Sequence, residues 1–300
     1  METFLHRGCP LCGNTSPKNE ISSSRRAENL LFADLKPYWS GLFKEKVFFS
    51  YARCPDCGLL YCPDYFTPSQ LAELYADMAP NMDVVPSATL CATQCNYWKS
   101  ILPRLGKGDY FELGPDIGYI VRLAAQTDIF EHYWLFEPNR AVHQQLAEAT
   151  AGWPYTISPA MDDFSAVPDA SVSAAVLIHV LDHLFDPLAT LRAIRRTMKP
   201  GGVLLIVTHN EKSLLRHAMS TRWPPFCLQH PEIYNPASIR QLVRTAGFSD
   251  VRIERSKNHF PIDFMVRQAG YAIGVNLGKL PLPTFSLGLK LGNIQTIAIA

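Results

Sequence analysis

Asp109-Tyr-Phe-Glu-Leu-Gly-Pro-Asp-Ile-Gly118 is the stretch that decides the fold. The apolar pair after its first residue enters a predicted buried strand, and Glu112 stands at the carboxyl end of that strand. Gly114 and Gly118 bracket a tight turn, because glycine adopts backbone conformations that a Cβ would hinder. Residues 119–125 then carry apolar side chains at helical spacing. The pattern predicts a strand, a turn and a helix, a unit that brings backbone N–H groups close to a ligand.

Downstream of this stretch, predicted strands and helices alternate. Such alternation is typical of a doubly wound, mostly parallel sheet. The fourth strand should be the central one, because it is strongly apolar and bounded by turns. The predicted strands after the first are residues 133–136, 155–157, 172–180, 202–208 and 250–254, with a last strand at 293–300.

Glu137 follows the second predicted strand, 25 residues after Glu112. In nucleotide-binding α/β folds, an acidic residue at this position accepts hydrogen bonds from both ribose hydroxyls. A carboxylate can accept two such bonds at once, which suits a cis-diol. The placement predicts a ligand that contains adenosine. The alternative is a surface glutamate that caps the next helix.

Two histidines are candidate general bases, since imidazole titrates near neutral pH. His183 follows the fourth predicted strand at its carboxyl end, where open α/β sheets bind ligands. His230 lies in a proline-bounded, aromatic-rich segment between the fifth strand and the next helix, where it could cover the molecule that accepts the transferred group. For each histidine the alternative is a capping or packed imidazole. His209 and His217 are weaker candidates.

The first 65 residues contain two copies of one cysteine pattern. Cys9-Pro-Leu-Cys12-Gly and Cys54-Pro-Asp-Cys57-Gly each place two thiols on a tight turn, and the following glycine frees backbone N–H groups to face sulfur. Two such turns predict a closed, structural Cys₄ zinc site formed by Cys9, Cys12, Cys54 and Cys57. The residues between the two pairs must fold over the site or project from it.

Composition limits the functional class. The chain has 300 residues, enough for one large domain or two smaller ones, and a formal net charge of +1. This charge is too neutral to indicate nucleic acid or an anionic membrane as a partner. The start has no apolar core of signal-peptide length, and we find no apolar run long enough for a transmembrane segment. We therefore expect a cytoplasmic protein with reduced thiols.

Taken together, these residues resemble the class I S-adenosylmethionine-dependent methyltransferase superfamily, over roughly residues 97–255 and the terminal strand. The resemblance is carried by six segments in this order and spacing: 112–118, Phe136-Glu-Pro-Asn139, Pro168-Asp-Ala-Ser171, His179-Val-Leu-Asp-His183, Lys199-Pro-Gly-Gly202 and Thr245-Ala-Gly-Phe248. The part from Cys9 to Tyr75 is similar to the zinc-binding domain fused to methyltransferases of carbohydrate and natural-product pathways.

The resemblance implies an α/β fold: a Rossmann-like seven-stranded methyltransferase sheet, mostly parallel with the last strand antiparallel, and a small N-terminal zinc-binding domain. The expected division is a zinc-binding domain at 1–66, a helical linker at 67–108, and a methyltransferase domain at 109–300. The last of these includes an apolar insertion at about 259–292. That insertion could act as a lid, as an interface with another copy, or as a surface that touches a membrane-bound substrate.

The same resemblance implies an enzyme that uses S-adenosylmethionine and carries Zn²⁺. Its acceptor would be a small molecule, a sugar or a natural-product intermediate, methylated at carbon, oxygen or nitrogen. In the cofactor site, the methionine end would be held by Glu112, Gly114, Asp116 and Gly118. Glu137, followed by Pro138, would hold the ribose. Asp162 or Asp163 would accept a hydrogen bond from the adenine amino group, and His179 would line the other side of the cofactor.

Asp116 departs from the family pattern, which usually has glycine there. Its carboxylate could turn to the cofactor's ammonium in a charge-assisted hydrogen bond. Alternatively, the site is remodelled and binds the cofactor weakly or not at all, which would leave a non-catalytic, methyltransferase-like binding protein. A further alternative is a ribosomal RNA methyltransferase with a zinc module, although such a protein should show a basic face.

Overall fold

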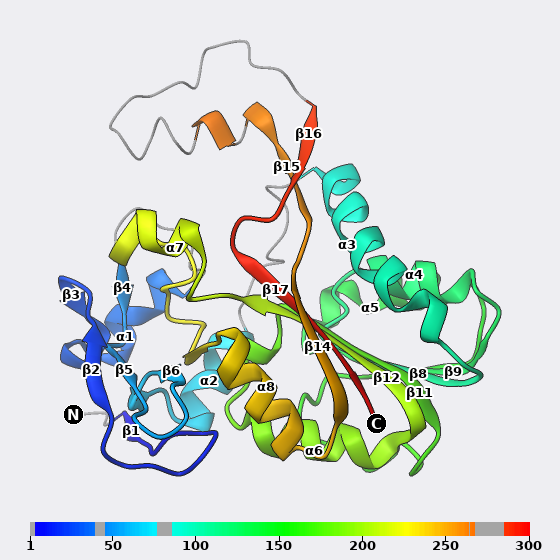
Figure 1. Ribbon diagram of the computed structural model, residues 1–300, viewed down its shortest axis with the longest axis horizontal. Coiled ribbons are helices and arrows are strands. Elements are labelled where there is room, and N and C mark those ends of the chain that lie inside the picture. Colours follow the sequence, from blue (N-terminus) through cyan, green and yellow to red (C-terminus); the bar gives the residue numbers. More distant parts are fainter. Residues whose placement is uncertain (1–3, 40–45, 77–85, 264, 268–284) are drawn as a thin grey trace.

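The computed structural model describes residues 4–39, 46–76, 86–263, 265–267 and 285–300 (Figure 1). Its largest sheet has seven strands: β8 (Gly108–Leu113), β9 (Phe130–Phe136), β10 (Tyr155–Ser158), β11 (Val172–Ile178), β12 (Met198–His209), β14 (Ser249–Arg255) and β17 (Asn293–Ile299). The spatial order is β10-β9-β8-β11-β12-β17-β14. All neighbours pair in parallel except β17, which is antiparallel to both β12 and β14. The predicted Rossmann-like, mostly parallel sheet with an antiparallel last strand is confirmed.

Helices cover both faces of this sheet (Figure 1). On one face lie α3 (Ser87–Ile101), α4 (Tyr119–Ala125) and α5 (His143–Ala149), and on the other lie α6 (Pro187–Thr197) and α8 (Pro236–Thr245). Within β11, Ala174 and Val176 pack in the core on the side of α3, α4 and α5. Ala175 and Leu177 pack in the core on the side of α6 and α8. Because β11 is buried on both faces, its sequence is a continuous apolar run.

A smaller four-stranded sheet occupies the N-terminal part. Its order is β13-β6-β5-β2, formed by β2 (Lys18–Ile21), β5 (Tyr51–Arg53), β6 (Leu60–Tyr61) and β13 (Glu232–Ile233). Around it lie β1 (Leu5–His6) paired with β7 (Asp64–Tyr65), β3 (Arg25–Arg26) paired with β4 (Val47–Phe48), and the helices α1 (Phe32–Leu35) and α2 (Pro68–Ala76). Strand β13 follows β12 in sequence, so a segment far along the chain completes the N-terminal sheet.

A buried core and an ion pair strengthen this connection. Trp223 and Phe226 belong to the same apolar cluster as Phe48 of β4. The Phe226 ring lies 5.6 Å from the Phe48 ring, centroid to centroid. Arg7 forms an ion pair with Glu232 of β13, with 2.6 Å between Nη1 and Oε1, and both side chains are buried. The N-terminal sheet and residues 223–233 therefore form one packed body.

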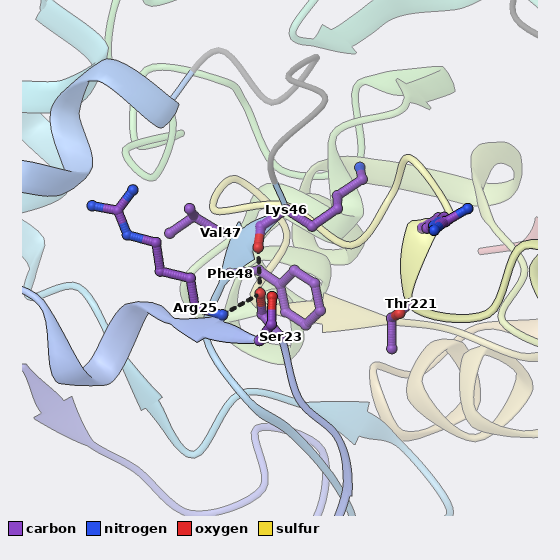
Figure 2. Close-up of a pocket in the computed structure, with 8 residues that line it drawn as sticks. Ser23, Arg25, Lys46, Val47, Phe48 and Thr221 are labelled. Carbon is purple, nitrogen blue, oxygen red and sulfur yellow. Dashed lines mark hydrogen bonds between the residues drawn. The ribbon is translucent and has the colours of Figure 1, made fainter. Parts of the chain in front are cut away.

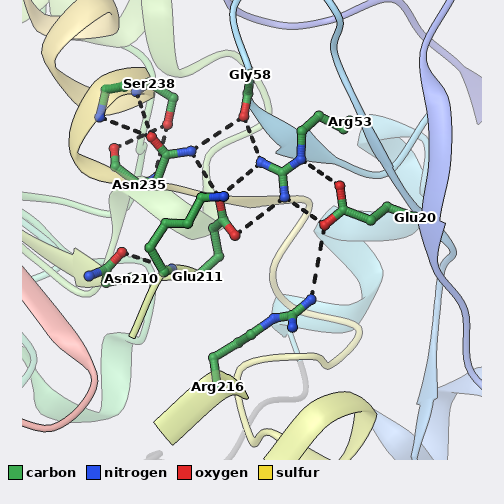
Figure 3. Close-up of polar contacts among 10 residues, drawn as sticks. Glu20, Arg53, Gly58, Asn210, Glu211, Arg216, Asn235 and Ser238 are labelled. Carbon is green, nitrogen blue, oxygen red and sulfur yellow. Dashed lines mark hydrogen bonds and ion pairs between the residues drawn. The ribbon is translucent and has the colours of Figure 1, made fainter. Parts of the chain in front are cut away.

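Arg53 lies at the centre of a second connection, shown in Figure 3. Its guanidinium donates to the Gly58 carbonyl at 2.8 Å, to Glu211 Oε1 at 2.9 Å and to Glu20 Oε2 at 2.5 Å. Asn235 donates to the same Glu211 oxygen at 2.9 Å, and its own Oδ1 accepts the first backbone N–H groups of α8. Glu211 thus links the second cysteine turn to the start of α8.

Part of the predicted apolar insertion is a two-stranded extension beside α3 (Figure 1). Strand β15 (Asn258–Pro261) pairs antiparallel with β16 (Ser286–Leu289). The Thr93 hydroxyl accepts the His259 N–H at 2.8 Å, and the hydroxyls of Thr89 and Ser286 lie 2.9 Å apart. Residues 264 and 268–284 of the insertion lie outside the described residues, so its role as a lid or interface stays a prediction. Within the described ranges, no helix combines the length and apolar character needed to cross a membrane.

Candidate active site and metal centre

The turn between β8 and α4 has left-handed backbone at three positions: φ is +68° at Gly114, +50° at Asp116 and +77° at Gly118. A Cβ on Gly114 would lie 2.5 Å from Val180 Cγ2, and one on Gly118 would lie 2.7 Å from Ala149 Cβ. The two glycines are therefore required by close packing as well as by conformation. Asp116 adopts a conformation that favours glycine, and aspartate is among the few residues that tolerate it.

Glu112 is buried in β8, and its side chain accepts a hydrogen bond from the Tyr110 hydroxyl at 2.5 Å. Burial raises the pKa of Glu112 to about 8, against the opposing effect of the Tyr110 hydrogen bond, and the Glu137 carboxylate adds to the rise. Such a carboxyl group loses its proton readily when a cation binds beside it. Its assignment to the methionine end of the cofactor stays a prediction.

Glu137 directly follows β9 and holds the glycine turn. Its Oε2 accepts the backbone N–H of Asp116 at 2.9 Å, and its Oε1 accepts that of Asn139 at 2.9 Å. Burial raises the pKa of Glu137, while these two N–H groups oppose the rise. Each oxygen keeps a lone pair for a ligand hydroxyl. The side chain that caps the following helical turn is that of Asn139, which accepts the Ala141 N–H at 3.1 Å.

Three further predicted cofactor residues follow β9 or β10 in the chain. Pro138 follows Glu137 and is half-buried. Asp162 and Asp163 are exposed in the loop after β10, the strand next to β9. Asp163 Oδ1 accepts the N–H of Ser165 at 3.0 Å. The contact of this pair with an adenine amino group stays a prediction.

Four histidines and one aspartate meet at the carboxyl ends of β11 and β12. His183 Nε2 lies 3.1 Å from His230 Nε2. The His209 ring lies 5.0 Å from the His230 ring and 4.8 Å from the His179 ring, centroid to centroid. Asp182 is fully buried among them and lies 3.8 Å from His209 Nε2. The fold therefore brings together the three predicted site histidines, His179, His183 and His230.

The two closest histidines have opposite pKa shifts. Burial lowers the pKa of His183 to about 3, and the nearby His230 adds to this effect. Burial also acts to lower the pKa of His230, but the Cys227 sulfur and the Asp182 carboxylate outweigh it and raise the value to about 9. His230 Nδ1 lies 2.7 Å from the Pro225 carbonyl oxygen. Of the two rings, His230 therefore has the higher affinity for a proton.

Several residues of this cluster had no role in the sequence prediction. Asp182 was assigned no role, although its position between His179 and His183 in the sequence could have indicated one. His209 was only a weak candidate. The Tyr75 hydroxyl lies 3.5 Å from His183 Nδ1, and Cys227 Sγ lies 3.4 Å from His230 Nδ1. No local pattern marks either residue, because both contacts cross between elements far apart in sequence.

The four predicted metal ligands also meet. The sulfurs of Cys9, Cys12, Cys54 and Cys57 all lie within 4.8 Å of one another. Cys9 and Cys57 are separated by 3.4 Å between sulfurs, and so are Cys12 and Cys54. Tetrahedral Zn²⁺ with bonds of about 2.3 Å places sulfurs about 3.8 Å apart, so a small outward movement would admit the ion.

Both cysteine turns have the same backbone hydrogen bonds. The residue after each pair, Gly13 or Gly58, has positive φ and donates its N–H to the carbonyl of the first cysteine, at 2.8 and 3.0 Å respectively. Backbone N–H groups also face the Cys9 sulfur, as the pattern predicted. The four thiols could therefore hold one metal ion.

A separate pocket opens between the N-terminal part and η6 (Ser220–Arg222), as Figure 2 shows. Its lining includes three cationic side chains, Arg25, Lys46 and Arg222, together with hydroxyl groups. The Ser23 hydroxyl accepts the Arg25 N–H at 3.1 Å and donates to the Lys46 carbonyl. This pocket is positively charged and contains none of the predicted site residues.

The sheet order, the glycine turn and the Glu137 carboxylate define a class I S-adenosylmethionine-dependent methyltransferase domain. Comparison with known proteins agrees: residues 92–253 match the family described as methyltransferase domain. That span exceeds half of the 300 residues, and the chain belongs to this family.

Individual relatives are more distant. An S-adenosylmethionine-dependent methyltransferase of Mycolicibacterium smegmatis, named as probable, is 35% identical over 82 residues. The match covers 27% of this chain and only 30% of that protein. Among solved structures, a methyltransferase from Archaeoglobus fulgidus has a TM-score of 0.46 at 18% identity, covering 67% of this chain and 90% of its own. One from Leishmania major has a TM-score of 0.45 at 13% identity, covering 90% and 82%.

Proposed function

We propose that this chain transfers the methyl group of S-adenosylmethionine to a small-molecule acceptor that lies beside His183 and His230. The observation that carries the proposal is the contact between the two halves of the site. Gly114 of the cofactor turn packs directly against Val180, which lies between His179 and the 3₁₀ turn η5 (Leu181–His183). A cofactor on the glycine turn therefore has the histidine cluster as its neighbour.

The cofactor, when bound, supplies an activated methyl group on a sulfonium, so the protein mainly positions the reactants and manages a proton. Glu112, Asp116 and the turn glycines would face the methionine end, Glu137 the ribose, and Asp162 or Asp163 the adenine. His183 and His230, whose Nε2 atoms lie 3.1 Å apart, would receive the acceptor's proton as a pair, and their pKa shifts favour its residence on His230. The buried carboxylate of Asp182 favours the positive charge that this transfer creates.

We further propose that Cys9, Cys12, Cys54 and Cys57 hold a structural Zn²⁺. The division into residues 1–66, 67–108 and 109–300 belongs to this proposal, with the qualification that β13 joins the N-terminal sheet. A zinc ion here would fix both cysteine turns, and Arg53 and Glu211 would transmit that rigidity to the start of α8. A cytoplasmic location would keep the thiols reduced.

The resemblance of the N-terminal part to zinc modules of carbohydrate and natural-product methyltransferases supports a sugar or natural-product intermediate as acceptor. The accepting atom is carbon, oxygen or nitrogen. A role of the 259–292 segment as a lid or as a contact with another copy stays part of this proposal, and within its described residues Phe285 and Leu287 are exposed.

Calorimetric titration with S-adenosylhomocysteine tests the cofactor site, and absence of binding at high ligand concentration would favour a non-catalytic protein. Methyl transfer from labelled cofactor to a panel of sugar and phenolic acceptors tests the activity. His183→Asn should lower the rate by about 100-fold or more and leave S-adenosylhomocysteine affinity unchanged, because a general base acts on the acceptor alone. His6→Asn, at an exposed histidine in the N-terminal part, is the matched control. Equal rates in both variants would remove His183 from the mechanism.

A further inference from the structure

The cluster at the carboxyl ends of β11 and β12 contains two overlapping sets of metal-binding atoms outside the cysteine site. Asp182, His183 and His230 form one set, and His179, Asp182 and His209 form the other. In each set, one ligand atom per residue lies within 4.8 Å of the others. Both sets share Asp182, so the carboxylate is the centre of the cluster.

Asp182 has the environment of a ligand without its ion. Its side chain is fully buried, and its Oδ1 has no hydrogen-bond partner within the described part of the chain. Its Oδ2 accepts the His209 backbone N–H at a long 3.4 Å. A buried carboxylate with an unsatisfied oxygen is costly, and a cation is the group that would best satisfy it.

The histidines are oriented as metal ligands usually are. A ligating imidazole commonly donates its second ring N–H to a carbonyl or carboxylate, which fixes the ring and leaves the other nitrogen free for the ion. His230 Nδ1 lies 2.7 Å from the Pro225 carbonyl oxygen, and His209 Nδ1 lies 3.0 Å from Asn293 Oδ1. In both residues Nε2 is the nitrogen turned into the cluster.

The spacing of the two closest nitrogens also fits. The Nε2 atoms of His183 and His230 lie 3.1 Å apart. Two nitrogens bound tetrahedrally at about 2.0–2.1 Å from one ion are separated by about 3.3 Å. Either a shared proton or a shared metal ion accounts for so short a distance, and a metal ion could in addition bond Oδ1 of Asp182.

We propose that Asp182, His183 and His230 bind a divalent transition-metal ion, distinct from the ion of the cysteine site. Two imidazoles and one carboxylate suit Zn²⁺, Fe²⁺, Co²⁺ or Mn²⁺ and leave a coordination position open. His209 contacts the same carboxylate and positions it. Cys227 is not a ligand, because its sulfur lies on the Nδ1 side of His230.

This ion deepens the proposed function and rests on it for its catalytic meaning. An acceptor that offers an oxygen atom could fill this open position. A divalent ion lowers the pKa of a bound hydroxyl. With the ion in place, His183 and His230 would act as its ligands, and the proton of the acceptor hydroxyl, made more acidic by the ion, would pass to solvent water.

The test uses the tag-free full chain, stripped of metal under reducing conditions and titrated with Co²⁺ alone. Thiolate ligands give Co²⁺ intense charge-transfer absorption, whereas nitrogen and oxygen ligands give only weak visible bands. We expect two bound equivalents, of which one lacks the thiolate absorption. Asp182→Asn and His230→Gln should each reduce bound cobalt from two equivalents to one and leave the thiolate bands intact.

Asp169→Asn and His217→Gln are the matched controls, since both residues lie outside the cluster. Both should keep two equivalents. A single equivalent in the parent chain, or a second equivalent that persists in both cluster variants, overturns the proposal. Binding of S-adenosylhomocysteine, measured on the same samples, separates the two ideas. If that ligand binds but no second ion does, the metal site fails and the proposed function stands. If the second ion binds but S-adenosylhomocysteine does not, the proposed function fails and the metal site stands.

Discussion

Asp116→Gly is the substitution that most directly tests the cofactor turn. If the Asp116 carboxylate binds the ammonium group of the cofactor, removing it should weaken the affinity for S-adenosylmethionine and S-adenosylhomocysteine. A hydrogen bond to a charged group contributes about 1.5–3 kcal/mol, which corresponds to a loss of about 10- to 150-fold in affinity. The Asp116 N–H that Glu137 accepts at 2.9 Å is a backbone group and survives the change.

Two smaller effects accompany the substitution. Glycine relieves the left-handed conformation at φ +50°, which costs a non-glycine residue of order 1 kcal/mol, and this relief changes the folding stability rather than the affinity. Loss of the Asp116 charge also removes one of the influences that raise the pKa of Glu137. We therefore expect the weakening to fall near the lower end of the range.

Asp128→Gly is the matched control, because Asp128 is an exposed aspartate with φ +57° in the loop before β9. Both variants make the same backbone change, so they should differ little in urea unfolding. Calorimetry with S-adenosylhomocysteine should then show weaker binding in Asp116→Gly only. Unchanged or tighter binding in that variant would refute the ammonium contact and favour a remodelled turn that the aspartate obstructs.

Three further predictions concern stability and metal content. Burial raises the pKa of Glu112 from 4.5 to about 8, so the folded state keeps a proton that the unfolded chain has lost, and stability should fall as pH rises through this window. Glu112→Gln should flatten that slope in urea unfolding, and a slope equal to the parent's would contradict the assignment. Gly118→Ala should cost about 2–4 kcal/mol, since its Cβ would meet an α5 side chain at 2.7 Å, whereas Gly152→Ala, with open space around it, should cost only about 1 kcal/mol of backbone strain. Cys54→Ser should abolish metal binding at the cysteine site, measured as loss of the thiolate absorption on titration with Co²⁺, while Cys91→Ser, at an exposed cysteine, should retain it.

Local patterns were sufficient for much of the fold. The strand, turn and helix at residues 108–125 follow from an apolar run, two glycines and a helical period, all of which are readable over a few residues. The buried strand β11 was predicted because a strand covered on both faces must be apolar throughout. The cysteine turns were equally readable, because each pair and its glycine form one short hydrogen-bonded unit.

Contacts between distant segments could not be read in this way. Strand β13 has only two residues, Glu232 and Ile233, and its pairing with β6 depends on the whole body of the protein. The contact of Tyr75 with His183 joins α2 to η5, across 108 positions of the sequence. Neither partner carries a local signal, since the energy of the contact arises only after both elements are packed.

The sequence by itself determined the class of fold, the cofactor turn and the four cysteines, because each rests on residues that act through their near neighbours. Only the tertiary structure decided that Asp182 is buried among four histidines. It also decided that the Nε2 atoms of His183 and His230 lie within hydrogen-bond distance of each other. Side-chain burial and the approach of segments far apart in sequence set that electrostatic environment. The same packing fixes the glycine turn, in which Glu137 accepts the N–H of Asp116 and Gly114 packs against Val180 in the segment that carries the histidines.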